Sequence, residues 1–447
     1  MENYSDADIE RALDWLMSFM HENHWPERFK EIENQLTEMI HNPGREEKTT
    51  KDMKVIKNKK DQIGWYMYLM QKLTSDITKY ESYQGARAAM VFKRIGMELD
   101  SVKKVGGIEK KVKKMLKSDK SQADSTLFEI LVASLWVRNG YTVSFVPEGS
   151  GRSADLLAIK GDEEWAVECK RLQQRSAYSI KEQDKWLAML SHVSNFLMTN
   201  NLLLEVVFHK ELHLLEETLL KDMLFSAKAS PEGNYAVNNE NLSFKASKIN
   251  LSAINKELEK SYVKYGSPYL RKLVGGDSES TGFTVGMSAQ MGTFGEKAGF
   301  NQYVVKIEKI YGVDWKCDAP DSIASKARDI WQQLIDANGQ LPGSNSAIHI
   351  GLETLDGTEV ELERFKRITE NTAIFDKGLS GLKMVYCHFF QSYSLPNVHF
   401  VYDETVVSFN EYSFTGNPLE TMHLLMPEYS TGGDTLHWLK PYPGKES

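Results

Sequence analysis

A chain of 447 residues is too long for one ordinary hydrophobic core, so two or three domains are expected. Hydrophobic residues at 41% and only 12 prolines exclude a disordered or fibrous protein. The formal net charge of −8 argues against a protein that coats nucleic acid over its whole surface, but it leaves room for a local basic groove.

The cysteines and the apolar segments narrow the class further. Cys169, Cys317 and Cys387 are far apart and lack metal-ligand spacing, which argues against a structural zinc site or a disulfide framework and favours a reducing compartment. The first residues are acidic and polar, unlike a secretory signal, and no window approaches the roughly 18 uninterrupted apolar residues of a membrane span. We therefore expect a cytoplasmic protein with no membrane partner.

Residues 1–118 are expected to form a helical region with a structural or recruiting role. Apolar residues recur at three- and four-residue spacing over Ile9–Met20 and Trp65–Leu73. Residues 42–44 and the pair Gly106–Gly107 are expected to break the helices.

Lysines are concentrated in residues 101–120, which hold eight of them against Glu109 and Asp119. Phosphate contact is one interpretation and a solvated helix face is the other. On the first interpretation the candidate substrate-binding lysines are Lys103, Lys104, Lys110 and Lys111.

Residues 119–225 show an ordered series of elements that predicts one α/β domain. An apolar helix over Ser125–Asn139 precedes Gly140, a typical C-cap. Three strands, a helix and a fourth strand then follow, over 141–146, 154–159, 164–171, 180–197 and 203–208.

The strand around Glu168 carries the clearest chemistry. Side chains alternate along a strand, so Glu168 and Lys170 share one face of an apolar strand, where unpaired charges are costly. A turn at 160–163 would bring Asp155 near Glu168, and two adjacent carboxylates suit Mg²⁺ or Mn²⁺. Such an ion activates water and polarises a phosphate, and Lys170 could orient that water or stabilise the transition state.

This stretch resembles the PD-(D/E)XK, or restriction-endonuclease-like, nuclease superfamily, whose core has the order helix, three strands, helix, strand (αβββαβ). Asp155 and Glu168 match the motif's two acids and Lys170 its lysine, while Ala154 replaces the proline. The resemblance implies a metal contact from the Cys169 backbone carbonyl. It also implies that Glu129, on the first helix, is a further metal ligand or a group that positions a ligand.

The same resemblance suggests two substrate-side residues on the helix that follows. Some members of the superfamily carry a glutamine and an aromatic residue there, and Gln183 and Trp186 occupy a comparable stretch with different spacing. They are weaker candidates than the acids and the lysine.

Residues 226–447 are expected to form a second α/β domain for recognition, sensing or oligomerisation. The Gly- and Ser-rich segment 275–299 is expected to be a loop, 323–337 and 360–369 to be helices, and 347–352, 382–390 and 398–402 to be strands.

Two histidine patterns have plainer explanations than metal binding. His209 and His213 have the spacing of a helical zinc pair, but His209 ends a predicted strand. His349 and Glu353 share a strand face, where a hydrogen-bonded histidine of the sheet is the simpler interpretation.

The sequence thus predicts an α/β, metal-dependent nuclease that acts on nucleic acid, with DNA as the expected substrate. By analogy it resembles the effectors of bacterial restriction and anti-phage defence. A non-catalytic binding or assembly protein and an RNA-directed nuclease remain the alternatives, and a homo-oligomer or a protein partner stays open.

Overall fold

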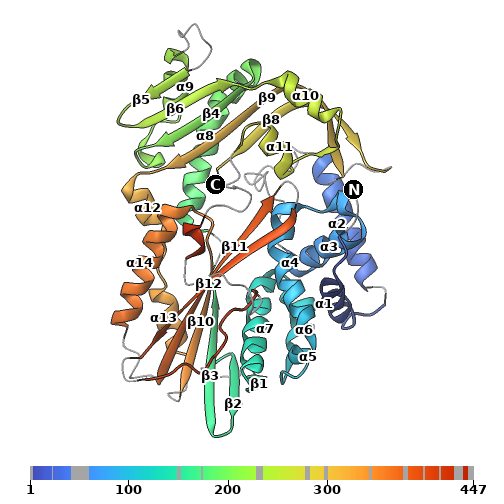
Figure 1. Ribbon diagram of the computed structural model, residues 1–447, viewed down its shortest axis with the longest axis vertical. Helices are drawn as coiled ribbons and strands as arrows, with labels where there is room; N and C mark the ends of the chain where they lie inside the picture. The colour runs from blue at the N-terminus through green and yellow to red at the C-terminus, as the bar shows by residue number, and fades with distance from the viewer. Residues whose placement is uncertain are drawn as a thin grey trace.

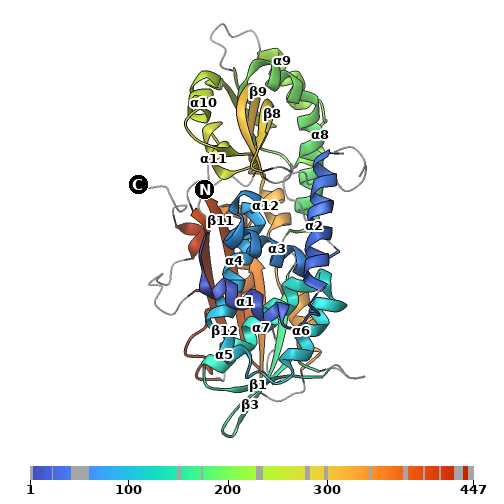
Figure 2. The ribbon, with the colours of Figure 1, turned by 90° about the vertical axis from the view of Figure 1, so that its right-hand side faces the viewer.

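The protein is described by a computed structural model, in which two mixed sheets carry helices on both faces (Figures 1 and 2). The described residues are 4–22, 24–41, 60–147, 153–172, 175–227, 235–276, 282–295, 301–341, 345–375, 381–395, 398–411, 414–426 and 436–440. The expected α/β class is confirmed. The predicted break at 42–44 lies outside the described residues.

The first sheet has the order β1-β2-β3-β10-β11-β12 and forms the lower half of the molecule in Figure 1. Its strands are β1 Thr142–Phe145, β2 Leu156–Lys160, β3 Glu163–Arg171, β10 Ser346–Glu353, β11 Leu382–Leu395 and β12 Val398–Asn410. β3 and β11 each run parallel to β10, while the other neighbouring pairs are antiparallel.

Seven helices precede this sheet in the described part of the chain. They are α1 Ala7–Met17, α2 His24–His41, α3 Gln62–Ser75, α4 Ser82–Met97, α5 Leu99–Val102, α6 Ile108–Lys117 and α7 Ala123–Arg138. The described residues up to 118 are therefore mainly helical, as predicted, and Gly106–Gly107 separates α5 from α6. One hydrophobic cluster joins these helices to the first sheet, so no boundary between cores falls at residue 118.

The opposite face of the first sheet is covered by α13 Trp331–Asn338 and α14 Thr358–Ile374. The helix expected over 323–337 is in fact two, because α12 Pro320–Lys326 ends before α13 begins. α13 lies directly against β3 and β10.

The second sheet is inserted between β3 and β10 and has the order β5-β6-β4-β9-β7, with β8 also paired to β9. Its strands are β4 Leu202–Phe208, β5 Tyr235–Asn238, β6 Leu242–Lys248, β7 Val263–Lys264, β8 Thr284–Thr293 and β9 Gln302–Cys317. Helices α8 Ala177–Asn200 and α9 Leu219–Ser226 pack in one hydrophobic cluster with it, and α10 Leu251–Leu258 and α11 Pro268–Leu273 in another.

Three predictions about this region need correction. The elements expected over 119–225 do not form one domain: β4, the strand after α8, pairs with β6 and β9 in the second sheet, and β10 takes the place next to β3. The expected boundary at residue 225 runs through the second sheet, because β4 and β6 pair across it. Part of the expected loop 275–299 is strand β8.

None of the helices in the described part of the chain has the length and apolar character that a bilayer crossing requires.

Candidate active site

The β2–β3 hairpin brings Asp155 to Glu168, as predicted. Gly161 turns the chain with a φ of 60°, a conformation that glycine adopts without strain. The antiparallel register places Leu156 opposite Val167, so Asp155, just before β2, lies beside the next residue of β3. Asp155 Oδ2 accepts a hydrogen bond of 2.8 Å from the backbone N–H of Cys169, which fixes this arrangement.

Glu168 is a buried carboxylate with one partnered oxygen. Its side chain is 1% exposed, and its Oε1 accepts a hydrogen bond of 2.7 Å from Lys170 Nζ. Its Oε2 is buried and has no hydrogen-bond partner. A buried oxygen without a partner is costly, so this atom is available to a ligand.

The negative charge of Asp155 disfavours the charged form of Glu168. Burial and the negative charge of Asp155 raise the pKa of Glu168 to about 7, while Lys170 acts in the opposite direction. The pKa of Asp155 is also raised, chiefly by burial, against the Cys169 hydrogen bond and the charges of Lys111 and Lys170. A cation between the two acids would remove this repulsion.

The residues therefore fit a divalent ion with oxygen ligands, held by Asp155 and by the free Oε2 of Glu168. Among the described residues, no three His, Cys, Asp or Glu side chains come close enough to hold a metal by themselves. Burial holds the pKa of the Cys169 thiol well above its usual range, so the thiol stays protonated and is a poor ligand. Water and substrate oxygens would complete the shell, as is usual for Mg²⁺.

Glu129 does not join the two carboxylates in a cluster of three. It lies on α7 and forms an ion pair with Lys111 of α6, with the two side chains 13% and 22% exposed. Lys111 is also close enough to Asp155 to lower its pKa. Of the candidate lysines, Lys111 thus lies at the site, paired with Glu129.

Gln340 is a site residue that the sequence analysis missed. It follows α13, and in the amide orientation that satisfies both neighbours its nitrogen donates to Glu168 Oε1 at 2.9 Å while its oxygen accepts from Lys170 Nζ at 3.2 Å. The amide therefore bridges the acid and the lysine and limits the rotation of both. No local signal marks this glutamine, because 168 residues, including the inserted sheet, lie between Arg171 at the end of β3 and Gln340.

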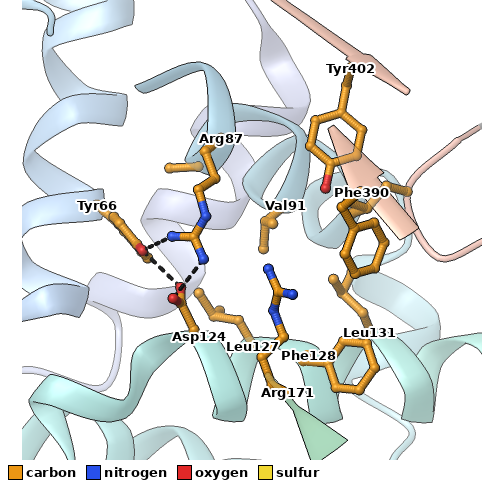
Figure 3. Close-up of a pocket in the computed structure, with 12 residues that line it drawn as sticks. Tyr66, Arg87, Val91, Asp124, Leu127, Phe128, Leu131, Arg171, Phe390 and Tyr402 are labelled. Carbon is orange, nitrogen blue, oxygen red and sulfur yellow. Dashed lines mark hydrogen bonds and ion pairs between the residues drawn. The ribbon is translucent and has the colours of Figure 1, made fainter. Parts of the chain in front are cut away.

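A buried network of ion pairs supports the end of β3, and Figure 3 shows the part of it that Arg87 and Asp124 form. Arg171, the residue after Lys170, pairs with Glu353 of β10, and Arg87 of α4 pairs with the same carboxylate. Arg87 also binds Asp124 at 2.6 Å, and although burial alone would raise the pKa of Asp124, this contact brings it to about 2. The adjoining cavity of about 30 Å³ has room for water but not for a nucleotide, so the network is a structural support.

The remaining substrate-side predictions have different outcomes. Trp186 is 1% exposed and stacks on Trp315 in the core of the second sheet, so its predicted substrate contact is wrong. Gln183 accepts a hydrogen bond from Arg175, near the N-terminal end of α8. The other candidate lysines, Lys103, Lys104 and Lys110, are exposed around the start of α6.

Both histidine patterns have structural partners. His209 binds Asp318 at 3.0 Å, and His213 lies 3.9 Å from Glu211. His349 is fully buried and accepts from Trp136 Nε1 at 3.1 Å. These histidines form structural contacts, as the plainer interpretation predicted.

Comparison with known proteins agrees with this geometry. Residues 121–189, which contain α7, β1–β3 and the first half of α8, match the family model described as "Restriction endonuclease". No curated protein and no solved structure gave a match. The predicted resemblance is thus confirmed for residues 121–189, the segment that matches the restriction-endonuclease model and contains the two acids and the lysine.

Proposed function

We propose that the protein hydrolyses phosphodiester bonds of DNA in a reaction that depends on Mg²⁺ or Mn²⁺. The observation that carries this proposal is the buried, unpartnered Oε2 of Glu168 beside Asp155, with Lys170 held against the other oxygen. A divalent ion bound there would lower the pKa of water and polarise the scissile phosphate.

The chain's own groups have distinct tasks in this proposal. Asp155 and Glu168 are the ion's ligands, and the Cys169 backbone N–H holds Asp155 in place. Lys170 projects from the same face of β3 as Glu168 and is 23% exposed, so its ammonium can reach a substrate. There it would orient the attacking water and stabilise the negative charge that develops on the phosphoryl oxygens.

The exposed lysines around α6 supply a surface for the nucleic-acid backbone. Gly106 forms a β-bridge with Ser144 of β1. This bridge places the lysine-rich segment at the edge of the sheet that contains the site. Lys103, Lys104 and Lys110 would contact phosphates, a mode that gives salt-dependent affinity without base specificity.

The family match also supports a role in restriction or anti-phage defence.

The test is cleavage of plasmid, linear duplex, single-stranded DNA and RNA with Mg²⁺, Mn²⁺ or EDTA. Cleavage of the DNA substrates with either ion, abolished by EDTA, is expected. Cleavage of RNA alone would replace the proposed substrate class, and cleavage that EDTA leaves unchanged would contradict the assigned centre.

Gln340→Ala is expected to slow cleavage by about 10- to 100-fold, the usual cost of removing a group that orients catalytic residues. The reason is that Lys170 and Glu168 lose the amide that bridges them. Single-turnover rates measure the effect, and the exposed Gln332→Ala on α13 is the matched control. Equal rates in the two variants would show that Gln340 has no positioning role.

A further inference from the structure

Lys111 is built into the candidate active site by a segment that lies outside the matched residues 121–189. The Gly106 N–H donates to the Val143 carbonyl, and the Phe145 N–H donates to the Gly106 carbonyl, both at 2.8 Å. A Cβ on Gly106 would lie 2.8 Å from that of Ser144, so this close contact with β1 requires glycine. The start of α6 is therefore fixed to the edge of the catalytic sheet.

The body of α6 is fixed as well. Val112, Met115 and Leu116 are fully or almost fully buried in the cluster that contains α7. With both the start and the apolar face of the helix held, Lys111 points toward α7. Its Nζ lies 5.4 Å from the centre of the Phe145 ring.

Glu129 holds the end of this lysine. The ion pair between Lys111 and Glu129 is largely shielded from solvent, and Lys111 acts on the charge of Asp155. An unrestrained lysine has considerable rotamer freedom, and a shielded carboxylate partner reduces it. Lys103, Lys104, Lys110 and Lys117 are all exposed.

The charges of the site explain why such a lysine is useful. Three carboxylates, Asp155, Glu168 and Glu129, would repel the phosphates of an approaching nucleic acid. Lys170 offsets Glu168, and Lys111 offsets Glu129. The ammonium of Lys111 also leaves two donors for a phosphate oxygen after it has bound one carboxylate oxygen.

We propose that Lys111 contacts a substrate phosphate beside the scissile bond and that Glu129 is the positioning residue for Lys111, not a ligand of the metal. This rests on the proposed nuclease function. It departs from the role that the family resemblance implied for Glu129.

A measurement of metal affinity shows whether Glu129 is a metal ligand or only positions Lys111, and it does not require the protein to cleave its substrate. Mn²⁺ affinity is to be measured by electron paramagnetic resonance titration of the wild-type chain, Asp155→Asn and Glu129→Gln. Asp155→Asn is expected to weaken binding by about 10-fold or more, and Glu129→Gln by less than about twofold. Equal losses in both variants would make Glu129 a ligand and overturn the proposal.

Duplex binding tests the phosphate contact of Lys111 directly. It is to be measured over a series of salt concentrations with Ca²⁺ in place of Mg²⁺. Lys111→Met is expected to reduce the slope of log K against log salt by about one, and Lys111→Arg to restore most of it. Lys117→Met, on the exposed side of α6, is the matched control. A slope in Lys111→Met equal to that of the wild type would overturn the phosphate contact.

Cleavage completes the test through a double-mutant cycle. Lys111→Met is expected to slow single-turnover cleavage by about 100-fold, and adding Glu129→Gln should slow it no further, because Glu129 then has nothing to position. Losses that multiply in the double variant would contradict the shared role. A wild-type chain that binds Mn²⁺ and DNA but cleaves nothing would refute the proposed function alone, since the two binding measurements do not depend on turnover.

Discussion

Replacing Lys170 with methionine is expected to slow cleavage by about 100- to 1,000-fold, the usual cost of losing one donor that stabilises a developing negative charge. Methionine keeps the apolar stem but cannot donate to Glu168 Oε1 or to a phosphoryl oxygen. Single-turnover cleavage of a labelled duplex measures the loss. Because Glu168 also loses its charged partner, thermal unfolding of each variant must accompany the assay.

Glu168→Gln distinguishes a catalytic loss from misfolding. Glutamine has nearly the same shape but removes a buried carboxyl group whose pKa lies at about 7 and which repels Asp155. We expect cleavage to fall at least as far as in Lys170→Met, while the melting temperature of the metal-free protein stays at or above that of the wild type. A variant that folds normally and cleaves at the wild-type rate would exclude Glu168 from the site.

Replacing Glu353 with glutamine is expected to lower the free energy of unfolding by about 3–5 kcal/mol, the range for removing one partner of a buried ion pair. Its carboxylate is 6% exposed and binds both Arg87 and Arg171. Arg87 retains Asp124, whereas Arg171 loses its ion-pair partner. Urea denaturation measures the difference, and a fall in cleavage should accompany it because Arg171 follows Lys170 on β3.

The double variant Arg171→Met/Glu353→Gln separates the ion pair from simple packing. It removes the stranded guanidinium together with the carboxylate, so it should recover most of the lost stability. Glu259→Gln, at an exposed position after α10, should change stability by less than about 0.5 kcal/mol. If Glu353→Gln costs no more than this control, the network does not stabilise the sheet.

The geometry of the candidate active site could be predicted because its signals are local. Period-two alternation in β3, a glycine turn and a hydrogen-bonded hairpin bring Asp155, Glu168 and Lys170 together within 16 residues. Each of these features depends on neighbours along the chain, where sequence patterns are most informative.

The partner of β3 could not be predicted in the same way. An apolar strand pattern shows that residues 203–208 form a strand but not which sheet receives it, and β4 pairs with β6 and β9. Parallel strands need only a crossover between them, and here the crossover from β3 to β10 contains a whole second sheet. Because of this insertion, the sequence did not indicate that Gln340, near the C-terminal end of the crossover, lies next to Glu168.

Two further predictions were wrong, one drawn from composition and one from the resemblance. Glycine and serine in 275–299 suggested a loop, but residues 284–293 form β8 because they pair along β9, and such tertiary pairing outweighs weak strand propensity. Trp186 was expected to meet substrate because of the helix it lies on, yet that face of α8 packs on the second sheet. Single-residue motifs on a helix do not show which face is buried.

The most direct test of the central claim is cleavage of supercoiled plasmid in Mg²⁺ by the wild-type chain and by Asp155→Asn, with matched folding confirmed by circular dichroism. The wild type is expected to relax or linearise the plasmid, EDTA is expected to stop this cleavage, and the variant is expected to be slower by about 100-fold or more. Equal, EDTA-resistant cleavage by both proteins would contradict a metal-dependent centre at Asp155, Glu168 and Lys170.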